Sequence, residues 1–279
     1  MEVEIDVGGA WGDPAPVVKR ATELAEAGAD AIVLVAPAVA RAKKKNKIVP
    51  SSGGDVDNEN NNNDEEADAA ATLACLLSVS RSLASNPKFR LGTGDISSDI
   101  AAGSSSSSAV PPVLLRDWIV HPLQLADVKA AGGAGALGAA AAVLGRGGPV
   151  LTSLGAAMGL DVPLEVVNAS ESREATAGGN GVPIIAVNVS LALSISISSI
   201  PGASRAVSQG ILNELPEGCF AVVGCSSLAA VSDAAQAGAA AVVVKEEAWR
   251  DALRPQGSFQ ENSVVQAMQE LRSAASLSD

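Results

Sequence analysis

The chain has 279 residues, of which 47% are hydrophobic but only 2% aromatic, and it contains no tyrosine. Its core must therefore be built from Ala, Val, Leu and Ile, a composition typical of parallel strands buried on both faces and covered by helices. The formal charge of −12 argues against a nucleic-acid or anionic-membrane partner, because neutralising phosphates requires clustered Lys and Arg.

The first half of the chain predicts two strands, two helices and two polar insertions. Strands are expected at residues 1–7 and 31–35, with a helix between them that starts at Asp13-Pro14. Residues 41–66 and 92–109 are rich in Asn or Ser and too polar to offset the entropy cost of ordering, so we predict low-complexity loop insertions there. An Ala/Leu helix is expected between the insertions, at residues 67–83.

The second half predicts a regular alternation of strands and helices. Strands are expected at residues 112–116, 134–144, 162–167, 183–189, 220–224 and 239–244, and helices at 122–131, 150–159, 171–177, 203–215, 228–237 and 259–275. Eight strands alternating with eight helices predict one (β/α)8 TIM barrel domain over residues 1–279, since parallel strands joined by helical crossovers close at eight. An open doubly wound sheet is the alternative.

The three cysteines and the hydropathy pattern bear on the compartment. Cys75, Cys219 and Cys225 stand at wide, irregular spacings that suggest neither a disulfide framework nor a metal site. No apolar run reaches the roughly 18 residues needed to cross a bilayer, and a signal-peptide pattern is absent. We therefore expect a soluble intracellular protein, in the cytosol or a plastid stroma, that is neither secreted nor inserted in a membrane.

Several segments resemble the indole-3-glycerol phosphate synthase family. PVLLRDWIVHPLQLADVKAAGGAGAL is similar to the family's third strand and following helix, with its P-V-L-R-K-D-F-I pattern. PLEVVNASESREAT, IIAVNVSLAL and AVVGCSSLAAVSDAAQAGAAAVVVKEEAWR are similar to its fifth to eighth strands. The resemblance covers residues 110–252 well and 1–36 weakly. It implies a barrel enzyme of tryptophan biosynthesis that closes an indole ring from a carboxyphenylamino-deoxyribulose phosphate, losing CO2 and water, without a cofactor.

Position by position, the resemblance implies four catalytic residues. Glu4 matches the first-strand Glu, Glu165 the fifth-strand Glu, and Asn188 the first Asn of the sixth-strand motif. Arg116 stands where the family has the Lys of R-K-D. It keeps a positive charge but is a poor proton donor, because a guanidinium does not titrate below about pH 12.

Other positions depart further from the family. Asp6 replaces the first-strand Lys, and Cys225 replaces the Glu of the E-S-G motif. We expect a degraded phosphate site at Ser226, Ser227 and Lys245, because Ser226 is kept but the other two replace glycines that permit close backbone approach. The family's extra N-terminal helix helps cover the pocket. It has no counterpart before the first strand here, so we expect the entrance to the pocket to be more open.

For several of these residues a purely structural role, or no role, is also open. Arg116 and Asp6 could form a structural ion pair across the mouth. Cys225 is expected to be an idle thiol, since the only histidine, His121, lies in the loop after the third strand. Lys245 could hold an anion as a point charge.

Together the substitutions predict a divergent barrel, inactive or weakly active, that is retained as a binding or structural subunit with a protein partner in a larger assembly. Two alternatives remain. One is a functional indole-3-glycerol phosphate synthase, a carbon-carbon lyase. The other is a barrel that binds another phosphorylated or acidic small molecule.

Overall fold

Nine parallel strands form one sheet in the computed structural model, which describes residues 2–6, 13–37, 61–90, 110–177, 184–188, 203–245, 248 and 261–276. The strand order is β4-β3-β2-β1-β9-β8-β7-β6-β5. The strands are β1 (Glu2–Asp6), β2 (Ala31–Val35), β3 (Val113–Arg116), β4 (Gly135–Leu137), β5 (Ala139–Ala140), β6 (Leu164–Val166), β7 (Ile184–Val187), β8 (Phe220–Cys225) and β9 (Ala241–Val244).

The two ends of this strand order are consecutive in the chain, so the sheet closes into a barrel. β4 pairs with β3 and β5 pairs with β6, and only Gly138 separates β4 from β5. The nine strands therefore occupy eight positions around the ring. Gly138 is required at the break because its φ is +105° and an added Cβ would overlap the carbonyl oxygen of Asp117.

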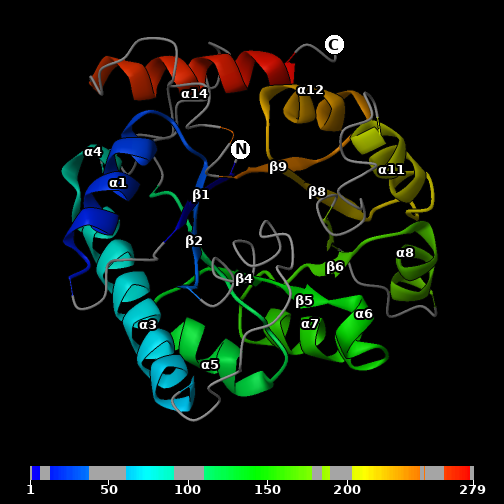
Figure 1. Ribbon diagram of the computed structural model, residues 1–279, viewed down its shortest axis with the longest axis horizontal. Coiled ribbons are helices and arrows are strands. Elements are labelled where there is room, and N and C mark those ends of the chain that lie inside the picture. Colours follow the sequence, from blue (N-terminus) through cyan, green and yellow to red (C-terminus); the bar gives the residue numbers. More distant parts are fainter. Residues whose placement is uncertain are drawn as a thin grey trace, which may run out of the picture.

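The helices form an outer ring around the strands (Figure 1). Those in the described residues are α1 (Ala15–Glu26), α3 (Asn61–Ser85), α4 (Pro87–Arg90), α5 (Pro122–Ala130), α6 (Ala141–Leu144), α7 (Gly147–Ala157), α8 (Ala169–Thr176), α11 (Ala203–Leu212), α12 (Leu228–Gln236) and α14 (Glu261–Ser276). The alternation of strands and helices around a closed ring confirms the predicted (β/α)8 barrel and excludes the open sheet.

Local boundaries differ from the sequence prediction at two places. The single strand expected at residues 134–144 is instead β4, β5 and the short helix α6. Helix α3 begins at Asn61, so residues 61–66 are helical although a loop was expected there. Three acidic residues, Asp64, Glu65 and Glu66, lie near this helix start, where negative charge is stabilising. Residues 41–60 and 92–109 lie outside the described residues.

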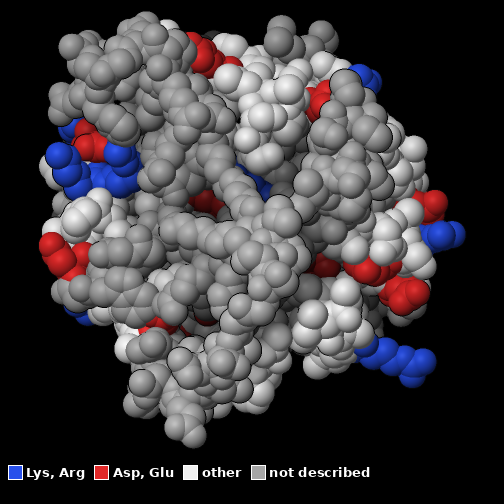
Figure 2. All heavy atoms as spheres, viewed as in Figure 1, with Lys and Arg blue, Asp and Glu red and all other residues white. Residues whose placement is uncertain are grey.

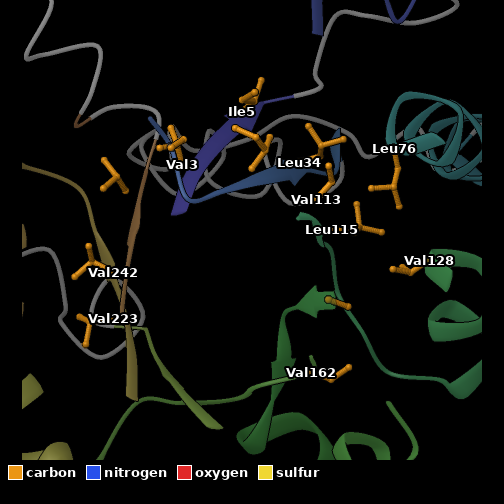
Figure 3. Packing of buried hydrophobic residues seen from close by; sticks show 14 of the residues in the cluster. Val3, Ile5, Leu34, Leu76, Val113, Leu115, Val128, Val162, Val223 and Val242 are labelled. Atoms are coloured by element: carbon orange, nitrogen blue, oxygen red, sulfur yellow. The ribbon is translucent and has the colours of Figure 1, made fainter. Parts of the chain in front are cut away.

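Side chains alternate between two hydrophobic layers, as the period of a strand requires. One set faces the helices: Val113 and Leu115 of β3 point toward Leu76 of α3 and Val128 of α5 (Figure 3). The other set fills the barrel interior and consists of Ala31, Val33, Leu114, Leu137, Val222 and Val243. The buried residues of the strands thus alternate between the interior and the helix-facing layer.

Helix α3 contains the one segment in the described chain that is long and apolar enough to cross a membrane, Ala67–Ser85. Its buried residues include Cys75, Leu76 and Leu83, which belong to the helix-facing layer of the core. The helix contacts α1 and β3. Of the apolar window, 33% is buried within the barrel by this packing.

Candidate functional site

A cluster of charged and amide side chains lies inside the barrel toward the carboxyl ends of the strands. Alternation from the interior residues directs four of the predicted positions inward: Glu4 of β1, Arg116 at the end of β3, Glu165 of β6 and Asn188 just after β7. All four are buried. They are far apart in the sequence, and closure of the barrel brings them together.

Arg116 bridges two carboxylates across the barrel. Its Nη1 donates to Oε1 of Glu4 at 3.0 Å, and its Nη2 lies 3.3 Å from Oε1 of Glu165. Asn188 extends the cluster, because its Nδ2 donates to Oε2 of Glu165 at 3.0 Å. The guanidinium thus spans from β1 to β6 above the apolar interior layer.

The surroundings hold Arg116 in its charged form. Burial works to lower the pKa of its guanidinium, but the charges of Glu165 and Glu4 and the hydrogen bond to Glu4 outweigh burial and raise that pKa. Lys245, which is also buried, follows β9 at an inward position next to Gly224. Lys245 is thus a second basic residue on the interior side of the barrel.

One buried acceptor in the cluster is left without a partner. Oδ1 of Asn188 makes no hydrogen bond, although its side chain is buried. A buried amide oxygen without a partner is unfavourable unless a water or ligand donates to it. The site therefore offers one unused hydrogen-bond acceptor.

A small pocket opens beside this acceptor. Its empty space of about 280 Å³ includes open solvent, and the enclosed part is far smaller than a small-molecule site. Its lining residues are Arg116, Leu137, Glu165, Ala186, Val187, Asn188, Val222, Gly224 and Val243. The apolar residues of this lining were not predicted from the sequence, although strand alternation counted from Glu165 or Arg116 identifies them.

The predicted phosphate-binding residues follow the neighbouring strands β8 and β9, where the backbone N-H of Lys245 donates to the carbonyl oxygen of Cys225 at 2.8 Å, but their side chains differ in burial. Ser226 and Ser227 are exposed, and the Ser227 hydroxyl accepts a hydrogen bond from the backbone N-H of Ala230 at 3.2 Å. Ser227 is therefore the N-cap of α12. Lys245 is buried on the interior side instead, with its Cε 3.4 Å from where a Cβ on Gly224 would lie. The lysine thus lies with the interior cluster.

Cys225 faces the opposite way from the cluster. It belongs to the layer between barrel and helices, and its Sγ lies 3.4 Å from the carbonyl oxygen of Ala230 in α12. Burial raises the pKa of its thiol to about 12, with Lys245 lowering the pKa and Asp233 adding to the rise. At neutral pH the thiol is therefore protonated, which agrees with an idle cysteine.

Two other predicted features can be placed in part. His121 caps helix α5, because its Nδ1 accepts from the backbone N-H of Leu123 at 3.2 Å. The backbone of Asp6 pairs with Val35, but the side chain of Asp6 lies outside the described residues, so its suggested pair with Arg116 stays a prediction. Within the described ranges no group of three or more His, Cys, Asp or Glu side chains could hold a metal ion.

Solved structures share the barrel at low sequence identity. The tryptophan synthase alpha chain of Legionella pneumophila subsp. pneumophila is 14% identical, with a TM-score of 0.53 over 98% of this chain and 90% of that one. The tryptophan synthase α2β2 complex of Pyrococcus furiosus contains a chain 14% identical, with a TM-score of 0.54 over 98% and 97%. A native KDPGal structure is 9% identical, with a TM-score of 0.56 over 99% and 94%.

At such identities the likeness shows the TIM-barrel fold alone. No protein family model matches the chain. No curated protein sequence matches it either. The finer resemblance to the indole-3-glycerol phosphate synthase family therefore stays a prediction.

Proposed function

We propose that this chain is a divergent barrel of the indole-3-glycerol phosphate synthase type that has little or no ring-closing activity and serves as a binding or structural subunit. The observation that carries the proposal is the bridge from Arg116 to Glu4 and Glu165. The three charged groups that the reaction would use are paired with one another.

Ring closure needs an acid that gives a proton to the substrate carbonyl and a base that takes one away. The guanidinium of Arg116 cannot supply that proton near neutral pH, and its raised pKa makes release still harder. Glu4 and Glu165 are both engaged by the same guanidinium. Proton transfer would therefore have to break a buried ion pair first.

The phosphate end of the site supports the same proposal. In the indole-3-glycerol phosphate synthase family, which this chain resembles, backbone N-H groups beside glycines hold the substrate phosphate. Here Ser227 stands at the position of one of those glycines, and its hydroxyl caps α12. Ser226 is exposed. Lys245, at the end of the neighbouring strand, is buried beside Gly224.

A working synthase is the second candidate, favoured by a specific observation. Glu4, Arg116, Glu165 and Asn188, chosen from four separate segments by resemblance, converge on one cluster. The unpartnered Oδ1 of Asn188 could accept a hydrogen bond from a ligand there. A third candidate, a barrel for another phosphorylated or acidic ligand, rests on the two buried cations Arg116 and Lys245.

The deciding experiment is an assay of the purified chain with the carboxyphenylamino-deoxyribulose phosphate, followed by the fluorescence of the indole product. We expect no turnover above background, and none after Arg116→Lys or the double change Asp6→Lys, Arg116→Lys. Turnover at an ordinary enzymatic rate by the unmodified chain would overturn the proposal in favour of the synthase. In that case Arg116→Lys should change the rate only modestly.

Calorimetry with the same compound and with inorganic phosphate separates the other candidates. Binding of the compound without turnover supports a binding subunit. Binding of phosphate that is lost in Lys245→Met favours the third candidate. Glu165→Gln is the matched control for the cluster, because it removes one carboxylate charge and keeps the shape of the side chain.

A further inference from the structure

The amide oxygen of Asn188 is a buried acceptor that the interior cluster does not use. Nδ2 of Asn188 donates to Oε2 of Glu165 at 3.0 Å, and this bond sets which end of the amide faces the carboxylate. Among the described residues none donates to Oδ1 at the other end. Asn188 is only 7% exposed, so its amide is almost entirely shielded from bulk solvent. A buried amide oxygen is expected to have a donor.

The charged groups next to this oxygen are engaged with one another. Arg116 donates to Glu4, and its Nη2 lies 3.3 Å from Oε1 of Glu165. The other oxygen of Glu165 accepts from Asn188. The position left open at Asn188 is thus an acceptor, and the group that complements it must carry an N-H or O-H. An ionised carboxylate offers only acceptors and does not complement it.

The pocket that Asn188 lines limits the size of that donor. The space open to the centre of a water molecule there is about 10 Å³. A cavity needs roughly 10–15 Å³ of this kind to hold one water. A sugar ring or a phosphate ester needs far more. A single water molecule is therefore the donor that matches the enclosed space.

The lining provides the further partners that a buried water needs. Such a water typically makes about three hydrogen bonds, and Arg116 and Glu165 line the same pocket as Asn188. The side chains of Val222 and Val243, on the remaining wall, offer none. The polar cluster alone would therefore fix the position of the water. Charged side chains of both signs are visible near the middle of the molecule (Figure 2).

We propose that the interior pocket holds one water molecule, which donates to Oδ1 of Asn188 and joins Asn188, Glu165 and Arg116 into a single polar network. The inference deepens the proposed function and rests on it, because it treats the cluster as a structural network whose ligand is water. With the water in place, every member of the network has a partner. A larger ligand would have to expel the water and open the pocket.

The first test is a crystal structure of the full chain at a resolution that orders water, grown without ammonium salts so that a single-atom peak is water. We expect a peak at roughly 2.5–3.0 Å from Oδ1 of Asn188. No peak there, or a protein group that donates to Oδ1 instead, would overturn the proposal. A peak of several joined atoms would also overturn it and would favour a small-molecule ligand.

Water-oxygen-17 magnetic relaxation dispersion provides a readout in solution, because it counts long-lived buried waters. Ala186→Val adds two methyl groups to the pocket lining and should remove one such water from the count. Ala221→Val is the matched control. Ala221 pairs with Ile185, which faces the helices, so this change leaves the pocket as it is and the count should not fall.

Val243→Leu fills the same pocket from β9 and replaces Ala186→Val if that variant does not fold, as circular dichroism would show. A count that stays unchanged in the filling variant, or falls equally in the control, would contradict the water site. The turnover assay is a separate measurement. Turnover together with a water at Oδ1 would sink the proposed function alone, whereas a missing water without turnover would sink this inference alone.

Discussion

The guanidinium of Arg116 lies 3.3 Å from the carboxylate of Glu165, and both side chains are almost completely buried inside the barrel. Buried ions are tolerated only when they are paired, since their removal from water costs several kcal/mol each. Arg116 and Glu165 therefore stabilise one another as a buried charge pair. This pair leads to the first prediction.

Arg116→Met should destabilise the protein by about 3–5 kcal/mol, because Glu4 and Glu165 would remain buried without a cation bridging them. Urea unfolding followed by circular dichroism measures the loss. The triple change Arg116→Met, Glu4→Gln, Glu165→Gln is the control and should be far milder, since no charge of the trio remains. Equal losses in both proteins would show that packing, rather than charge, dominates at this position.

Gly138→Ala should be strongly destabilising, by more than about 3 kcal/mol, because the backbone has a positive φ and an added Cβ overlaps the Asp117 carbonyl oxygen. Gly210→Ala is the matched comparison. Gly210 lies within α11 with no atom within 4 Å of an added Cβ, so this change should stabilise the protein by about 0.5–1 kcal/mol. Thermal unfolding of both variants against the unmodified chain checks the contrast.

Alkaline pH should weaken the fold through Cys225. The pKa of its thiol is raised from 9.0 to about 12 by burial, so the folded state favours the neutral thiol. The resulting stability is fully present below about pH 9 and is lost as the pH rises toward 12, at about 1.4 kcal/mol per pH unit. The difference in unfolding free energy between the unmodified chain and Cys225→Ala should follow this slope. A difference independent of pH between 8 and 11 would show that the thiol titrates alike in both states.

The last helix is held to the barrel mainly by apolar contacts. Arg272 donates from Nη2 to the carbonyl oxygen of Gly28 and to Oδ1 of Asp30 at 3.0 Å, but it is half exposed, so Arg272→Ala should cost less than about 1 kcal/mol. Leu271 is fully buried, and Leu271→Ala should cost about 2–5 kcal/mol. Urea unfolding of the two variants measures the ratio, and a larger cost for Arg272→Ala would reverse this assignment.

The barrel could be predicted from the sequence because its strands are short apolar runs bounded by polar turns and separated by helical spacing. Runs such as residues 31–35 and 220–224 have this character, and both are strands. The split at Gly138 could not be predicted, because it depends on the close approach of Asp117, a residue on the neighbouring strand connection. Because the residues on both sides of Gly138 are small and apolar, residues 134–144 were predicted as one strand.

The sequence named the residues of the interior cluster one at a time but gave neither their contacts nor their orientation. Glu4, Arg116 and Glu165 were identified singly, and the ion pairs between them come only from closure of the barrel. Cys225 shows the opposite case. Its outward orientation follows from strand alternation, since Val222 and Gly224 line the interior, but matching positions to a family says nothing about the face on which each side chain lies.

The break at Gly138 also gives the barrel a seam. Here β3 is bonded to β4 and β6 to β5, with an isolated bridge from Gly135 to Asp161 beside them. The β5–β6 ladder aligns two residue pairs, as the β1–β9 ladder does, whereas the β1–β2 ladder aligns five. Fewer ladder hydrogen bonds must break for the sheet to open at these two junctions, so native-state amide exchange should be faster there than between β1 and β2.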